Sequence, residues 1–265
     1  MIRVDENDIS YDIYGVRAAD CDRFNDASLT FFFSAIQEMG GAHAHMKGLS
    51  IEQMQKNQGW TWIVTRSHVD FHRIPHWFDD VHMVSWPQKG YHLNCPRAVE
   101  GYVDGELYFE AMTHWVLMDI QKMRPVRPKE VEDILPAPDE STHFKDPALK
   151  KLPRWEDFEA VEERPTYTPH PHYYDIDINK HVNNIIYTRW LAEALGEDFL
   201  NDFRPSVMDV QWIQQTYAHD EIRVETIFLE KTEDKVEVAQ RIMRKETEKE
   251  DTLLFEAVSS WIHKH

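Results

Sequence analysis

The sequence predicts an α+β fold of two tandem repeats, each with a long helix and several antiparallel strands. Two pairs of matching segments indicate the duplication. Residues 109–116 and 255–262 are identical at four of eight positions, and both alternate apolar with polar side chains as half-buried strands do. Residues 20–38 match residues 175–193, with Asp, Asp and Glu at corresponding places. Two matches in the same order at similar offsets predict a repeated unit.

The first repeat is delimited by apolar periodicity and by turn residues. Its helix is expected over residues 29–47, where Phe32 and Ile36 lie in an apolar segment with helical character. Its strands are expected over residues 60–71, 80–86, 94–103 and 107–119.

The second repeat has a clear helix start. Asn183 and Asn184 are good N-cap residues, and Ile186, Trp190 and Ala194 form one apolar stripe after them. The helix is therefore expected over residues 183–195. Strands are expected over residues 207–215, 221–229, 235–244 and 252–263.

The stretch between the repeats contains prolines and many acidic residues, and it has no sustained periodicity. These features predict a linker over residues 136–166. The predicted domains are therefore residues 1–135 and residues 167–265.

The composition of the 265-residue chain, 42% hydrophobic with nine glycines, predicts a globular protein with a packed interior. Its net charge of −18 argues against general nucleic-acid binding, which depends on neutralising phosphates. No apolar run approaches the ~20 residues that span a bilayer, and no signal-peptide pattern is seen. Cys21 and Cys95 are too few for a disulfide framework, so a reducing compartment, the cytoplasm, is expected.

Residues 173–182 carry an unusual density of polar side chains. If this segment is an extended strand, Asp175, Asp177, Asn179 and His181 point to one face, although Asp and Asn are poor strand formers. The polar face would then converge on the N-terminus of the following helix. Backbone N–H groups and the positive end of the helix dipole could stabilise an oxyanion there.

A capping and turn network without chemistry is the alternative interpretation of this segment. Neither a metal nor another cofactor is expected. The pairs His43–His45 and His170–His172 lack a third ligand, and there is no glycine-rich phosphate loop.

The segment Asp177-Ile-Asn-Lys-His-Val-Asn-Asn184 resembles the Asp-x-Asn-x-His-Val-Asn-Asn signature of acyl-acyl carrier protein (acyl-ACP) thioesterases of the plant and bacterial type. The stretches 62–66, 115–119 and 124–125 of the first half are similar to that family as well. The resemblance extends from about Ile13 to the end of the chain. A looser form of the signature occurs in small acyl-CoA thioesterases.

The resemblance implies a double hotdog fold, in which an antiparallel sheet wraps a long helix in each repeat. It implies an N-terminal hotdog suited to lining an acyl pocket and a catalytic C-terminal hotdog. The implied reaction is hydrolysis of fatty acyl-ACP to free fatty acid, in fatty acid biosynthesis. The catalytic set carried over is Asp177, Asn179 and His181, and the expected substrate-binding residues are Asn183, Asn184 and Trp190.

Gln215 departs from the family pattern, which often has Glu at this place. An amide can orient water or a carbonyl, but it cannot act as a base. Gln215 is therefore expected in the catalytic set as a hydrogen-bonding residue, with Asp177 or His181 as the base. Direct attack by Asp177 and attack by an activated water both stay open.

The expected partner is an acyl carrier protein, which is acidic, and residues 122–129 are the densest basic stretch that could meet it. The rival functions are an acyl-CoA thioesterase on the same fold, a non-catalytic acyl-binding module and a hotdog hydratase, which the signature resembles less closely. A monomer or a homodimer is expected, and the preferred acyl chain length is not determined by the sequence.

Overall fold

The computed structural model describes residues 2–139, 143, 145–248 and 250–264. The chain divides into two compact units, residues 1–149 (unit 1) and residues 150–265 (unit 2). Among the described helices, none is both long and apolar enough to cross a membrane.

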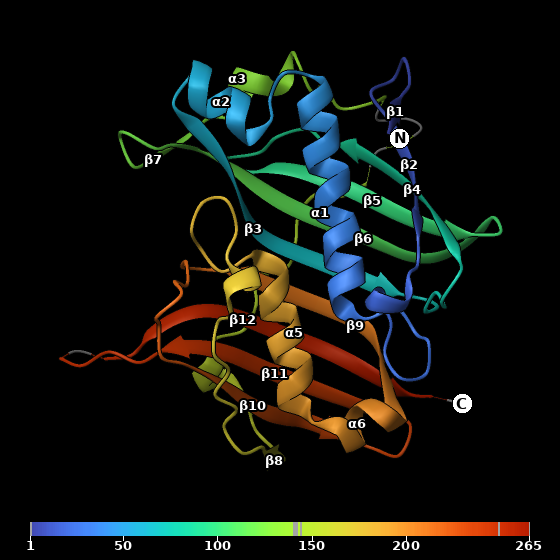
Figure 1. Ribbon diagram of the computed structural model, residues 1–265, viewed down its shortest axis with the longest axis vertical. Helices are drawn as coiled ribbons and strands as arrows, with labels where there is room; N and C mark the ends of the chain where they lie inside the picture. The colour runs from blue at the N-terminus through green and yellow to red at the C-terminus, as the bar shows by residue number, and fades with distance from the viewer. Residues whose placement is uncertain (1, 140–142, 144, 249, 265) are drawn as a thin grey trace. The chain divides into compact units, whose positions relative to one another are not determined.

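Unit 1 is an antiparallel sheet with a long helix along one face (Figure 1). The strands pair in the order β1-β2-β4-β5-β6-β3, and β7 pairs with β6. The strands are β1 (Arg3–Val4), β2 (Ser10–Gly15), β3 (Trp60–Phe71), β4 (Asp80–Pro87), β5 (Cys95–Val103), β6 (Glu106–Asp119) and β7 (Arg124–Val126). The helices are η1 (Ala18–Asp20), α1 (Leu29–Met46), α2 (Ile51–Asn57) and α3 (Lys129–Glu132).

The packing of α1 follows from its apolar residues. Phe32 is fully buried, and its ring makes edge contacts with Phe71 of β3 and Phe109 of β6 at centroid distances of 4.9 and 5.0 Å. Gly101 in β5 gives Phe109 its room, because a Cβ at this position would lie 2.2 Å from the Phe109 ring. The core of unit 1 therefore depends on an aromatic cluster and one glycine.

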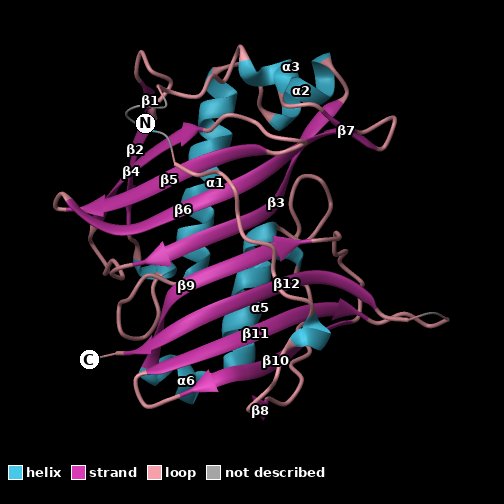
Figure 2. Ribbon diagram, turned by 180° about the vertical axis from the view of Figure 1, so that it is seen from behind, coloured by secondary structure: helices cyan, strands magenta, loops and turns pink. Residues whose placement is uncertain are grey.

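Unit 2 has the same architecture (Figure 2). Its strands pair in the order β9-β12-β11-β10-β8. The strands are β8 (Glu162–Glu163), β9 (Phe203–Trp212), β10 (Ile222–Lys231), β11 (Lys235–Arg244) and β12 (Thr252–His263). The helices are η2 (Trp155–Asp157), η3 (Tyr173–Asp175), α5 (Asn184–Leu195) and α6 (Glu197–Asp202). Tyr187 and Trp190 of α5 are buried, and Tyr187 packs against Phe255 of β12.

The internal repeat is visible in the strand order. The order β4-β5-β6-β3 in unit 1 corresponds to β10-β11-β12-β9 in unit 2. The matching segments 109–116 and 255–262 lie in β6 and β12, which hold equivalent places. The predicted architecture of two helix-and-sheet repeats is confirmed.

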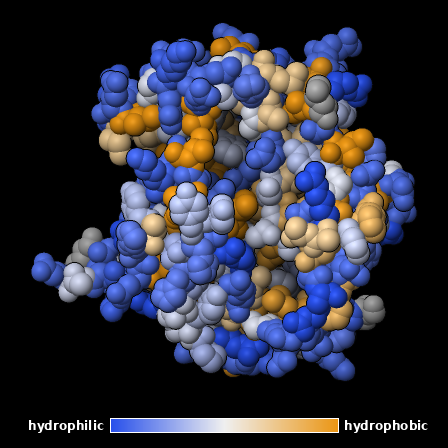
Figure 3. All heavy atoms as spheres, viewed as in Figure 1, coloured by the Kyte–Doolittle hydropathy of each residue, from blue (hydrophilic) through white to orange (hydrophobic). Residues whose placement is uncertain are grey.

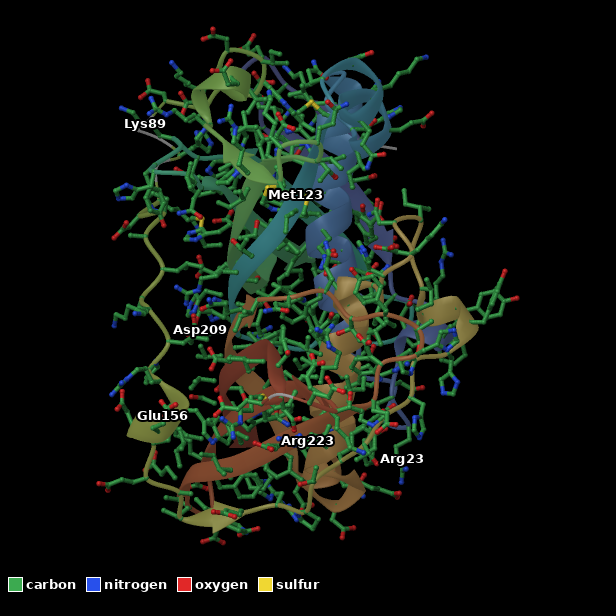
Figure 4. All side chains as sticks on the ribbon, turned by 90° about the vertical axis from the view of Figure 1, so that its left-hand side faces the viewer. Arg23, Lys89, Met123, Glu156, Asp209 and Arg223 are labelled. Atoms are coloured by element: carbon green, nitrogen blue, oxygen red, sulfur yellow. The ribbon has the colours of Figure 1, made fainter. Side chains whose placement is uncertain are left out.

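The predicted linker over residues 136–166 is held against both units for much of its length. In unit 1, the Trp86 indole donates to the His143 carbonyl at 2.9 Å, and His114 donates to the Pro147 carbonyl at 2.7 Å. In unit 2, the Arg241 guanidinium lies over the Trp155 ring, and β8 pairs with β10. Figure 4 shows Glu156 of η2 beside the strands of unit 2. The domain limits at 135 and 167 stay predictions.

Candidate active site

The prediction of an extended strand over residues 173–182 is wrong. Tyr173–Asp175 form the short helix η3, and Ile176 and Val182 form a single antiparallel bridge. Between them the chain makes a tight turn, here called the Asp177 turn (residues 177–181). The Asp177 N–H donates to the His181 carbonyl at 2.8 Å, and Lys180 has a positive φ of 65°. The polar side chains are therefore gathered by a turn and not by strand alternation.

The carboxylate of Asp177 explains why the turn replaces the strand. Its Oδ1 atom accepts the backbone N–H groups of Asn179 at 2.8 Å and His181 at 3.2 Å. Asp and Asn favour such local bonds over strand pairing. In the described part of the chain, no hydrogen bond to Oδ2 is found. One oxygen of Asp177 thus holds the turn, and the other accepts no hydrogen bond from the described residues.

Asp175 connects the turn to α5. This carboxylate is 4% exposed and accepts hydrogen bonds from Arg189 Nη2 to both oxygens at 3.0 Å. The Asp175 carbonyl also accepts the Asn183 N–H at 2.8 Å. Asp175 is therefore a structural residue that fixes where α5 begins.

A second loop, which follows β9, lies against the Asp177 turn. The Val182 N–H donates to the Thr216 carbonyl at 2.8 Å, and the Tyr187 hydroxyl donates to Thr216 Oγ1 at 2.7 Å. Thr216 is fully buried, and burial raises the pKa of Tyr187 to about 12. This anchoring places the neighbours of Thr216 beside the Asp177 turn.

Tyr217 links two of the predicted site residues. Its ring meets the His181 ring edge to face, with centroids 5.1 Å apart, and its hydroxyl donates to Gln215 Oε1 at 3.3 Å. The structure thus brings His181 and Gln215 together through a residue that the sequence reasoning missed. Its contacts join two separate loops, so no pattern in the sequence points to it.

The N-terminus of α5 supplies fewer free N–H groups than expected. Asn183 is the N-cap, as predicted, and its side chain accepts the Ile185 N–H at 3.2 Å. The Asn184 carbonyl accepts the Trp212 indole N–H at 3.3 Å. For the Asn184 N–H, no acceptor is found among the described residues. Trp190 is 1% exposed in the core of unit 2, and its contact with substrate stays a prediction.

Unit 1 contains the same turn at residues 22–26, here called the Asp22 turn. Asp22 Oδ1 accepts the N–H groups of Phe24 at 2.8 Å and Asp26 at 3.1 Å, and Asn25 has a φ of 67°. The Asp22 N–H donates to the Asp26 carbonyl at 2.8 Å. The same turn therefore forms with Phe24 and Asp26 at the places of Asn179 and His181.

The adjoining loops also correspond. The Ala27 N–H donates to the Pro75 carbonyl at 2.8 Å, just as Val182 donates to Thr216. In unit 1 the next residue is His76, and its Nδ1 atom lies 2.8 Å from Asp26 Oδ1. The two units thus share a backbone frame but differ in the side chains that it presents. Within the described ranges, no three His, Cys, Asp or Glu side chains are grouped to hold a metal ion.

Models of one protein family match both units. The model of the acyl-ACP thioesterase N-terminal domain matches residues 9–135, and that of the C-terminal domain matches residues 158–262. Together these matches span most of the chain.

Curated relatives agree with this match. Oleoyl-acyl carrier protein thioesterase 1 of Arabidopsis thaliana is 24% identical over 237 residues, which cover 81% of this chain and 63% of the relative. Palmitoyl-acyl carrier protein thioesterase of Cuphea hookeriana is 28% identical over 203 residues, which cover 71% of this chain and 47% of the relative. The chain thus spans less than two-thirds of the length of these relatives, both named as chloroplastic.

Solved structures share the fold over nearly the whole chain. A provisionally named oleoyl thioesterase from Lactobacillus plantarum has a TM-score of 0.83 at 23% identity, with 97% of each chain covered. The 12:0-ACP thioesterase from Umbellularia californica has a TM-score of 0.79 at 20% identity, covering 97% of this chain and 98% of its own. These likenesses confirm the predicted double hotdog fold. The matches to both domain models show that the chain belongs to the acyl-ACP thioesterase family.

Proposed function

We propose that the protein hydrolyses fatty acyl thioesters of acyl carrier protein and releases free fatty acid for lipid metabolism. One observation carries this proposal. The Asp22 and Asp177 turns have the same hydrogen bonds, yet only the Asp177 turn contains Asn179 and His181. Folding of the turn does not require these two side chains, so a chemical role accounts for them better.

The proposed reaction uses the free oxygen of Asp177. Water attacks the thioester carbonyl carbon while Asp177 Oδ2 takes its proton, and the carbon–sulfur bond then breaks. His181 gives a proton to the departing thiolate. Asn179 and the Asn184 N–H stabilise the oxyanion.

Direct attack by Asp177 on the carbonyl is the other route, through an anhydride that water then hydrolyses. A single turnover in isotopically labelled water separates the two routes. Label in the Asp177 carboxylate would exclude the activated-water route.

The test of the site uses the internal repeat as its control. We expect Asp177→Ala and His181→Ala each to lower kcat by ~10²–10⁴-fold, as loss of acid–base catalysis does. Asp22→Ala removes the same turn bonds in unit 1 and should leave kcat within about a factor of two, an expectation consistent with a purely structural role. Wild-type rates in both unit 2 variants would contradict the site.

The proposed docking surface for the carrier is the basic turn (residues 122–129), which includes β7. Met123 is 78% exposed at its tip, and Figure 4 labels this residue. Arg124 and Arg127 are exposed, and in the described part of the chain neither makes an ion pair. A local positive surface can attract an acidic partner even though the net charge is −18, because distant charges are screened.

Gln215 supports a second candidate, a hotdog protein that binds acyl ligands without turnover, because an amide cannot serve as a base. An acyl-CoA thioesterase on the same fold is the other rival. Matched acyl-ACP and acyl-CoA substrates of graded chain length separate all three. Higher kcat/KM for acyl-ACP supports the proposal, whereas binding without product supports the non-catalytic candidate.

We also propose that the protein acts in a reducing compartment, the cytoplasm. Cys21 and Cys95 are both free thiols, and burial raises the pKa of Cys95 to about 12. A buried thiol of high pKa reacts slowly with oxidants.

Light scattering would decide between a monomer and a homodimer.

A further inference from the structure

We propose that Tyr217 is a positioning residue that turns the Gln215 amide into a hydrogen-bond donor for the reacting thioester carbonyl. This inference rests on the proposed hydrolase function and deepens it. It assigns a role to a residue outside the signature and explains how Gln215 can serve at a place where the family often has Glu.

The orientation of Gln215 follows from its one side-chain partner. The Tyr217 hydroxyl donates to Gln215 Oε1 at 3.3 Å, so the amide oxygen faces the hydroxyl of Tyr217. The amide nitrogen carries two N–H donors on the opposite side. Gln215 is exposed, and among the described residues no acceptor for Nε2 is found. The N–H groups are thus free to donate to a substrate oxygen.

The backbone of this loop is fixed on both sides of Tyr217. The Tyr217 N–H donates to Asp220 Oδ2 at 2.8 Å. Arg244 Nη1 lies 3.4 Å from both the Gln215 carbonyl and Asp220 Oδ2. Thr216, which lies between Gln215 and Tyr217 in the sequence, is fully buried. A fixed backbone determines the direction of the Tyr217 side chain and hence that of the Gln215 amide.

Tyr217 also contacts the proposed proton donor. Its ring meets the His181 ring at 5.1 Å with an interplanar angle of 80°. One side chain therefore lies against both His181 and Gln215, which come from separate loops. This contact keeps the donor amide on the same side of the Asp177 turn as the imidazole.

Unit 1 supports the inference independently. Because Pro75 corresponds to Thr216 in the hydrogen-bond frame, Ile74 holds the place of Gln215 and His76 that of Tyr217. Ile74 has no polar group to orient, and His76 pairs with Asp26 instead. The tyrosine–amide pair therefore occurs only in the unit that carries Asn179 and His181.

Tyr217→Phe tests the inference, because it removes the hydroxyl and keeps the ring contact with His181. We expect kcat to fall about 3- to 10-fold with KM unchanged, the size of one lost neutral hydrogen bond. In a Gln215→Ala background the same substitution should change kcat by less than about 1.5-fold, since the group that it orients is gone. Tyr174→Phe is the control, because Tyr174 is 94% exposed and, among the described residues, its hydroxyl makes no hydrogen bond to either site loop.

A second measurement reads the hydrogen bond itself. In a Gln215→Glu background the Tyr217 hydroxyl would donate to the new carboxylate and lower its pKa. Adding Tyr217→Phe should then shift the acidic limb of the kcat/KM profile upward by about 0.5–1 pH unit. A structural role alone would not move this limb.

The outcomes separate this inference from the proposed function. Equal effects of Tyr217→Phe with and without Gln215, or an unmoved acidic limb, would overturn the positioning role while the hydrolase function stands. A wild-type protein without hydrolase activity would overturn the function and this inference together.

Discussion

Asp177 has a structural and a chemical part in the proposed site, one for each carboxylate oxygen. Oδ1 holds two backbone N–H groups, while Oδ2 is available to substrate and water. Removing the whole side chain therefore mixes a folding effect with a catalytic one. A substitution that keeps the acceptor and removes the charge separates them.

Asp177→Asn is that substitution. The amide oxygen can still accept both N–H groups, so the melting temperature should change by no more than about 2 °C. The amide cannot take a proton at neutral pH, so kcat should fall ~10²-fold or more. Asp22→Asn is the matched control and should retain wild-type kcat. Calorimetry measures the melting temperature, and steady-state kinetics on acyl-ACP measure kcat. A lower melting temperature with wild-type kcat would contradict the separate roles of the two oxygens.

At this scale the signature indicated the residues of the proposed site but not their geometry. Asp177, Asn179 and His181 were selected by resemblance, and alternation on a strand was the wrong reason for their convergence. Strand periodicity cannot reveal that a carboxylate closes its own turn. Tyr217 was missed because its proposed role depends on contacts across two loops.

The limits of several strands were predictable from the pattern of apolar and polar residues. β3 and β11 have the predicted limits, although runs of apolar or of polar residues interrupt the alternation in both. β9 covers Phe203–Trp212, whereas the strand was expected over residues 207–215, so it begins and ends earlier than expected. Pro205 lies opposite Trp261, where the register shifts, and such an irregularity tolerates a residue without an N–H.

Two glycines in unit 1 should respond in opposite ways to alanine. Gly101→Ala places a Cβ against the Phe109 ring and should cost about 1–3 kcal/mol of unfolding free energy. Gly41→Ala lies on an exposed part of α1 with nothing within 4 Å, and it should add about 0.5–1 kcal/mol. Urea titration measures both. Equal effects of the two substitutions would contradict the close contact at Gly101.

The basic turn is an element whose charge can be tested. Arg124→Glu and Arg127→Glu should each raise KM for acyl-ACP about 5-fold or more and leave kcat unchanged, because charge reversal weakens encounter with an acidic partner. KM for acyl-CoA should respond less. Lys151→Glu makes the same change of charge at another exposed position and serves as the control. An unchanged KM at low salt would remove this turn from the docking surface.

The molecule as a whole has a surface that is mostly hydrophilic on the face drawn in Figure 3, with scattered apolar side chains. Several large apolar residues are strongly exposed, among them Phe78 at 79% and Ile178 at 85%. The interior of unit 1, in contrast, contains a charged group: buried Arg97 donates to His43 Nδ1 at 3.1 Å. Composition did not predict this buried pair, since no periodicity distinguishes it.

His43 should make global stability depend on pH. Burial, with a further contribution from the Arg97 charge, lowers the pKa of His43 from 6.5 to about 4. The unfolded chain therefore binds this proton more readily than the folded protein. The contribution of His43 to the free energy of unfolding should be fully present above pH 6.5 and should be lost as the pH falls toward 4.

The test is a comparison of urea midpoints across this range for wild type and His43→Gln. The variant should be less stable at pH 7 but should lose less further stability between pH 6.5 and 4. His45→Gln is the control on the exposed side of α1. Parallel pH profiles for wild type and His43→Gln would contradict the assignment.

The Asp22 turn has a consequence for how new chemistry could arise in this chain. The Asp22 turn has the same backbone as the Asp177 turn. It has the aspartate, the residue with positive φ and the helix that follows. Phe24 and Asp26 are the positions at which Asn and His stand in the other unit. Few side chains therefore separate unit 1 from the proposed site of unit 2, so a second site could arise in unit 1 by substitutions within an existing turn.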